Sequence, residues 1–144
     1  MVRAHTSGHI IESGMRMPTV RCGKKKIVDA REINLWLIEV PRIDVAVVES
    51  VHAMPKQGVS SSFSFGRNTG AVESLALIHA RVVNWVTPQL WKKHFGLSKI
   101  KKESIILAQE IYGTRFYWDR LADDGVAEAA LMAQWYLDTN NSME

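Results

Sequence analysis

Three carboxylates stand where they could bind a metal ion. Asp124 and Glu128 are four residues apart, so a helix would place both on one face, where like charges repel by about 0.2–0.5 kcal/mol. Glu49 ends the apolar run 43–49, which predicts a strand, and a carboxylate is costly to bury without a partner. Magnesium is typically held by carboxylates and water, so these residues are candidate ligands for Mg²⁺ or Mn²⁺. Simpler explanations stay open: Glu49 reaches solvent, and Asp123 or Asp124 caps the helix.

Lysine and arginine are clustered, although the net charge is only +3. Residues 1–31 contain seven of them against two acids, and residues 91–102 contain five lysines and no acid. Clusters of this kind attract phosphate backbones. A solvated surface would explain either cluster alone, so the clusters indicate a nucleic-acid partner only together with other evidence.

The totals predict one domain over residues 1–144, with residues 1–8 and 138–144 disordered. A length of 144 residues with 47% hydrophobic content suits a single buried core. Cys22 is the one cysteine, which excludes an internal disulfide and a cysteine zinc cluster. No apolar run approaches the roughly 18 residues that span a bilayer. We therefore expect a cytoplasmic protein.

The first half of the chain predicts strands around two helices. A strand within 9–17 and a hairpin over 19–28 precede a helix that Asp29 caps and Pro41 ends. The strand 43–49 should be buried on both faces and should pair in parallel, through that helix and a right-handed crossover, with the strand before it.

The second half predicts mainly helices. Serines 60–62 should cap a long helix reaching about residue 80, whose small residues every fourth position indicate close packing on the sheet or on a second subunit. A strand at 81–86 and a short helix with Thr87 as N-cap follow. Further helices are expected over 98–112 and 124–137, separated by a loop over 113–122. The inner face of the first should carry Ile105, Ile106, Ala108 and Ile111.

Three segments carry a resemblance to a known family. They are Val48-Glu49-Ser50-Val51-His52-Ala53-Met54-Pro55-Lys56-Gln57-Gly58-Val59-Ser60-Ser61-Ser62-Phe63-Ser64-Phe65-Gly66-Arg67, Val86-Thr87-Pro88-Gln89-Leu90-Trp91-Lys92 and Asp124-Gly125-Val126-Ala127-Glu128-Ala129. They resemble RuvC-type crossover-junction (Holliday junction) endonucleases, enzymes of DNA recombination and repair, and especially their phage and prophage branch. The likeness covers roughly residues 8–136, and it implies the cytoplasm of a bacterium or of a phage-infected host cell.

The resemblance implies an α/β, RNase H-like fold, a mixed sheet flanked by helices, with a carboxylate-bound pair of Mg²⁺ or Mn²⁺ ions. It implies a homodimer that resolves four-way DNA junctions by phosphodiester hydrolysis, without a small-molecule cofactor. By position, Glu49 and Glu128 match family ligands. Asp124 matches less cleanly, because many members space their helical acids by three, which falls on Gly125 here.

Basic residues complete the predicted site. Lys102, or its neighbour Lys101, lies where the family places a basic residue near the cleaved phosphate, and Lys102 is the predicted catalytic lysine. The predicted DNA-binding residues are Lys56, Arg67, Lys92, Lys93, Lys101 and Lys102. Phe63 and Phe65 could contact unstacked bases together with Arg67, although core packing explains the phenylalanines equally well.

One family feature is missing from this sequence. Members open with a strand of the type Ile-x-Gly-Ile-Asp-x-Gly, whose aspartate is the leading metal ligand, and this chain has no such segment. We therefore expect an amino-terminally truncated sequence, or one started from an internal methionine. Two alternatives to a junction endonuclease stay open: a catalytically impaired homologue that only binds branched nucleic acid, and an RNase H-like protein acting on RNA or in phage packaging.

Overall fold

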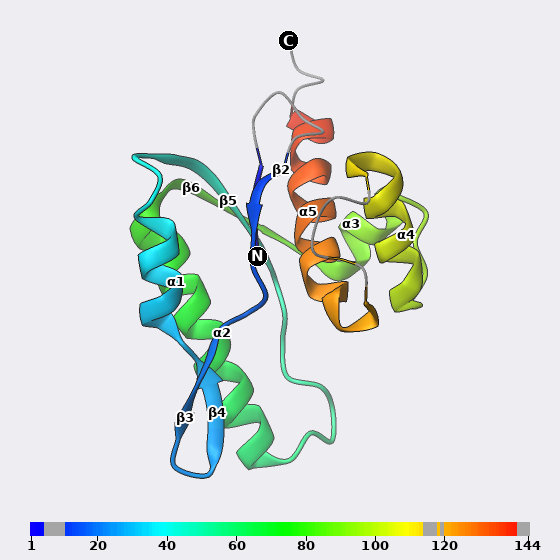
Figure 1. Cartoon of the computed structure of the whole chain (residues 1–144). Helices are drawn as coiled ribbons and strands as arrows, with labels where there is room; N and C mark the ends of the chain where they lie inside the picture. The colour runs from blue at the N-terminus through cyan, green and yellow to red at the C-terminus, as the bar shows by residue number, and fades with distance from the viewer. Residues whose placement is uncertain (5–10, 114–117, 119, 141–144) are drawn as a thin grey trace. The chain divides into compact units, whose positions relative to one another are not determined.

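The computed structural model describes residues 1–4, 11–113, 118 and 120–140 (Figure 1). The chain divides into two compact units. The central unit is Met17–Val86, and the terminal unit combines Met1–Arg16 with Thr87–Glu144. The described structure is mixed α/β, with helices and three two-stranded sheets. The prediction of a single domain over 1–144 stays a prediction.

The central unit begins with the predicted hairpin, which is confirmed. Strands β3 (Thr19–Cys22) and β4 (Lys25–Val28) pair antiparallel. The two-residue turn has Gly23 at φ +61°, and a positive φ at the first turn residue is typical of the type II′ hairpin turn. All four residues of β3 are exposed, so the hairpin contributes little to the core.

Helix α1 (Ala30–Leu37) follows as the cap signal predicts. The Asp29 carboxylate accepts a hydrogen bond from the backbone N–H of Glu32 at 3.1 Å, which satisfies one of the free donors at the start of the helix. Ile33 is 1% exposed and is the buried anchor of this helix.

The remaining elements of the central unit form one parallel crossover. Strand β5 (Ile43–Glu49) leads through helix α2 (Val59–His79) to strand β6 (Ala80–Val86). The strands pair in parallel from Ile43 opposite Ala80 to Glu49 opposite Val86. A helix of this length rises about 30 Å, which is ample to return the chain to the start of a neighbouring strand.

Two predictions for β5 are wrong. Its parallel partner is β6, not the strand before α1, and among the described strands β4 pairs with β3 alone. β5 is also not buried on both faces: Asp44 is exposed and the other six residues are half-buried. Within the described strands β5 has one neighbour, so it lies at the edge of a small sheet and not at the centre of a large one.

Helix α2 also departs from the prediction at two points. Its N-cap is Gly58, which has no side chain to cap with, and the serines lie within the first turn instead. A Cβ atom added at Gly66 or Gly70 would meet no atom within 4 Å. The expectation that these glycines pack closely on the sheet is therefore wrong within the described residues, and close packing on a second subunit stays a prediction. Phe63 is 71% exposed, so it does not pack in a core.

The terminal unit is mostly helical. Strands β1 (Val2–Ala4) and β2 (Ile11–Gly14) pair antiparallel, and helices α3, α4 and α5 lie together in Figure 1. The helices match the predicted segments: α3 is Pro88–His94, α4 is Lys101–Tyr112, and a 3₁₀ turn η1 (Leu121–Asp123) leads into α5 (Asp124–Asn140). Thr87 and Pro88 stand at the N-cap and first helical position as predicted.

The core of this unit lies where α3 and α4 meet α5. Trp91, Trp118, Ala130 and Leu131 are all 0% exposed. On α4 the buried residues are Ser104, Ile105 and Ala108. Ile106 is 43% exposed, so its predicted place on the inner face is wrong.

The termini are partly ordered. Residues 2–4 form β1, and α5 continues through residue 140, so the disorder predicted for 1–8 and 138–144 is wrong for these residues. Residues 5–8 and 141–144 lie outside the described residues, as do Phe116 and Tyr117 of the predicted loop. Searched over the described ranges, the helices include none with the length and apolar character needed to cross a membrane.

Candidate active site

Two adjacent aspartates, Asp123 at the end of η1 and Asp124 at the start of α5, have different surroundings. Asp123 is 4% exposed and accepts a hydrogen bond from the backbone N–H of Arg120 at 3.2 Å. It also forms an ion pair with the Arg16 guanidinium. Asp123 therefore closes the turn that begins the helix, and Asp124 is left to interact with a different partner.

Asp124 pairs with Lys101 at the start of α4. The Lys101 Nζ lies 2.5 Å from the Asp124 Oδ2. The hydrogen bond from Lys101 lowers the pKa of Asp124, and the same hydrogen bond raises the pKa of Lys101. The lysine side chain is 70% exposed and the aspartate 19%, so the lysine could swing away while the carboxylate stays in place.

Glu128, one turn along α5, pairs with Lys92 of α3. The Lys92 Nζ lies 2.8 Å from the Glu128 Oε1, and both side chains are 23% exposed. The ammonium group also lies 5.0 Å from the ring centroid of the buried Trp91, a cation–π distance. The Lys92 ammonium group thus has two partners, the Glu128 carboxylate and the Trp91 ring.

The four side chains form one cluster, which we call the acid–lysine cluster: Lys92, Lys101, Asp124 and Glu128. The negative charge of Glu128 contributes to the raised pKa of Lys101, so the two pairs interact electrostatically. Both predicted helical acids lie in this cluster, together with two of the predicted DNA-binding lysines. The sequence reasoning assigned acids to a metal and lysines to phosphate, and it missed that they pair with one another.

The cluster contains the donors that a magnesium ion requires. Magnesium is commonly bound through one or two protein carboxylates together with water and substrate phosphates. Asp124 and Glu128 supply two partly exposed carboxylates one helical turn apart, and they would hold the ion. Within the described residues, no three His, Cys, Asp or Glu side chains gather into a group that could hold a metal ion by themselves.

Glu49 belongs to the central unit. It is half-buried and ends β5 opposite Val86, just before the backbone N–H of Ser50 donates to the carbonyl of Val86 at 2.8 Å. The predicted position at a strand end is confirmed, and the role of Glu49 as a metal ligand stays a prediction.

The other predicted DNA-binding residues differ in their surroundings. Lys93 and Lys102 are exposed, and neither has a carboxylate within ion-pair distance among the residues that the structure describes. The sequence left open whether Lys101 or Lys102 approaches the phosphate, and Lys101 is the one that pairs with a candidate ligand. Arg67 of α2 is exposed, with its guanidinium nitrogens 3.9 and 4.0 Å from the Cys22 Sγ.

Lys56 lies in a strained turn. The backbone N–H of Gln57 donates to the carbonyl of Met54 at 3.1 Å, and Lys56 has φ +66°. Proline at the second position and a positive φ at the third are typical of a type II turn, in which the third residue is usually glycine. A lysine at this position therefore adopts its positive φ at a cost in conformational free energy.

Comparison with known proteins adds no assignment. A scan against known protein families finds no match, and a search of curated proteins finds none either.

Proposed function

We propose that the chain is a Mg²⁺-dependent, structure-selective DNA endonuclease of the RuvC-like kind, with an RNase H-like fold, that acts as a homodimer on four-way junctions. The proposal combines the sequence resemblance with one observation, the acid–lysine cluster. Two carboxylates on one helical face and two lysines directed at them bring together groups for a divalent cation and groups for a phosphate.

In this proposal each residue has a defined task. Asp124 and Glu128 would hold the metal, with Glu49 as the further ligand that the resemblance implies, and the metal would supply Lewis-acid activation of the phosphodiester and of the attacking water. Lys101 and Lys92 exchange their carboxylate partners for phosphate oxygens, and Lys102 and Lys93 contact the strand nearby. The lysines thus have two alternating partners, a carboxylate and a phosphate.

One observation also favours the second candidate, a homologue that binds branched nucleic acid without cutting it. Both helical carboxylates already have a cation partner in the lysines, so the cluster is electrically satisfied without a metal. A binding protein could retain such pairs as structural ion pairs.

Junction nicking in Mg²⁺ distinguishes the two candidates. The test compares the purified chain with Glu128→Gln, which keeps the side-chain shape but removes the charge that a hard cation requires. Glu110→Gln, on the exposed side of α4, is the matched control. Metal-dependent nicking lost only in Glu128→Gln supports the endonuclease. Junction binding without nicking by the unaltered chain supports the binding protein, and equal nicking by all three removes Glu128 from the site.

A further inference from the structure

The tip of the β3–β4 hairpin concentrates positive charge without any acid. Arg21, Lys24, Lys25 and Lys26 fall within six consecutive residues, and all are exposed. No acidic residue occurs within 17–28, nor within 50–72, which contains the neighbouring half of α2. No described carboxylate lies within ion-pair distance of any of these four side chains.

The register places the cations on both sides of the hairpin. Lys25 lies opposite Cys22 and donates to the hydroxyls of Ser60 and Ser64 at 2.7 and 3.1 Å, so this side of the hairpin is directed toward α2. Arg67 of α2 joins it at Cys22. Because side chains alternate along a strand, the next pair is directed to the opposite side.

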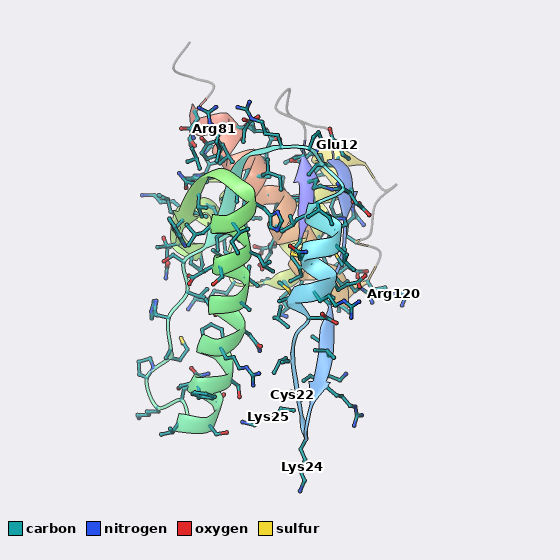
Figure 2. All side chains as sticks on the ribbon, turned by 90° about the vertical axis from the view of Figure 1, so that its left-hand side faces the viewer. Glu12, Cys22, Lys24, Lys25, Arg81 and Arg120 are labelled. Atoms are coloured by element: carbon teal, nitrogen blue, oxygen red, sulfur yellow. The ribbon has the colours of Figure 1, made fainter. Side chains whose placement is uncertain are left out.

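That next pair consists of two like charges. Arg21 and Lys26 are direct cross-strand partners, an arrangement that destabilises an antiparallel ladder. Lys24 occupies the turn itself, at the extremity of the hairpin (Figure 2). Cations therefore lie on the open face of the hairpin, at its end and on the face directed toward α2, and no described carboxylate pairs with them.

We propose that this hairpin is a nucleic-acid-binding arm that enters a duplex groove and contacts phosphates on both sides of it. The B-DNA major groove is about 12 Å wide and admits a two-stranded β-ribbon. Phosphates flank such a groove on both sides, which matches cations on both faces of the ribbon. A flat anionic surface, such as a membrane, would engage only one face.

The arm rests on the proposed function only in taking duplex nucleic acid as the ligand. The arm shares no residue with the acid–lysine cluster, because all residues of the arm belong to the central unit and those of the cluster to the terminal unit. It also adds four basic residues to the predicted DNA-binding set, none of which the sequence reasoning had assigned a partner individually.

The test measures the salt dependence of binding to a short DNA duplex by fluorescence anisotropy, with the full chain. The two double variants Arg21→Gln/Lys26→Gln and Lys25→Gln/Arg67→Gln each remove the cations of one face. The control Arg31→Gln/Arg81→Gln removes two exposed cations elsewhere in the same unit, one of which is labelled in Figure 2. Each hairpin variant should lower the log–log salt slope by about 1.8, and the control should leave it unchanged.

Several results would overturn the arm. These are unchanged slopes in the hairpin variants, an effect confined to one face, or an equal loss in the control. The chain could also bind phosphatidylserine vesicles or polyglutamate as tightly as the DNA duplex, or more tightly. If the hairpin variants lost that binding, the hairpin would be assigned to another anion. Lys24→Gln, at the turn, provides a variant outside the strands in case a double variant melts early, and it should lower the slope by about 0.9.

The nicking assay separates the two proposals. Unaltered slopes in a chain that nicks junctions would remove the arm and leave the endonuclease. Reduced slopes in the hairpin variants of a chain that never nicks would remove the endonuclease and leave the arm.

Discussion

Two groups of basic residues, one beside α5 in the terminal unit and one at the hairpin tip in the central unit, have opposite surroundings. In the terminal unit, Lys92 and Lys101 each lie against a carboxylate of α5, and Arg16 lies against the buried Asp123. In the central unit, the cations at the hairpin tip have hydroxyls, a thiol or solvent around them and no described acid.

This difference separates two uses of positive charge. A lysine that already pairs with a carboxylate must give up that ion pair to bind a phosphate, so it gains only the difference between the two interaction free energies. Such a lysine suits a site in which a metal would become the new partner of the carboxylate. An unpaired, exposed cation gives up only counterions, so it suits binding to a backbone without sequence preference. The following predictions test this contrast, beginning with the largest expected effect.

Glu49→Gln should reduce Mg²⁺-dependent junction cleavage by at least about 100-fold while junction affinity stays the same or rises. The amide preserves the side-chain shape but is a poor ligand for a hard cation. Nicking and gel-shift assays on the same preparation measure both quantities. Glu73→Gln on α2 is the control in the same unit, and normal cleavage by Glu49→Gln would remove Glu49 from the site.

Asp123→Ala should lower the free energy of unfolding by about 1–3 kcal/mol. It deletes a buried carboxylate that receives both a backbone N–H and a guanidinium. Asp44→Ala breaks a pair with Arg42 in which both side chains are more than half exposed, and should cost under about 1 kcal/mol. Urea unfolding compares the two variants, and equal losses would show that burial does not strengthen the terminal-unit pair.

Lys101→Met should raise the pKa of Asp124 and strengthen Mn²⁺ binding. Lys101 lowers that pKa, so the pair stabilises the fold above the ordinary aspartate pKa, and this contribution is lost as the pH falls through the lowered value. Removing the lysine also frees the carboxylate for a cation, which should increase Mn²⁺ affinity about two- to fivefold.

Carboxyl NMR titration and Mn²⁺ electron paramagnetic resonance measure these two effects. Lys93→Met, on the exposed side of α3, should change neither quantity. An Asp124 pKa that stays low in Lys101→Met would show that something other than the lysine sets it.

Lys56→Gly should stabilise the chain by about 0.5–1 kcal/mol, because glycine adopts the positive φ of this turn without steric cost. It should also lower the salt slope of DNA binding by about 0.9 if Lys56 contacts a phosphate. Thermal melting and anisotropy provide the two measurements. Lys24→Gly, which replaces a lysine without a positive φ, should not stabilise the chain.

Local structure was largely predictable from the sequence, because it depends on local causes. The hairpin turn at Gly23, the cap at Asp29 and the Thr87–Pro88 start of α3 each involve hydrogen bonds or backbone angles within a few residues. The strand ending at Glu49 and the helix carrying Asp124 and Glu128 were found for the same reason. Spacing along a helix is enough to place two acids on one face.

Only the tertiary structure decided which elements pair and which charges meet. The apolar run of β5 was compatible with either neighbouring strand, and only the fold shows that it pairs with β6 while β4 pairs with β3. Lys92 and Glu128 are 36 residues apart, and Arg16 and Asp123 are 107 apart. No spacing signal links residues so distant, because their approach follows from how helices pack, and packing depends on the shape of many side chains at once. The sequence alone therefore determined the types of groups available for chemistry, and the fold determined that two of the lysines lie against the acids while no described acid lies against the hairpin cations.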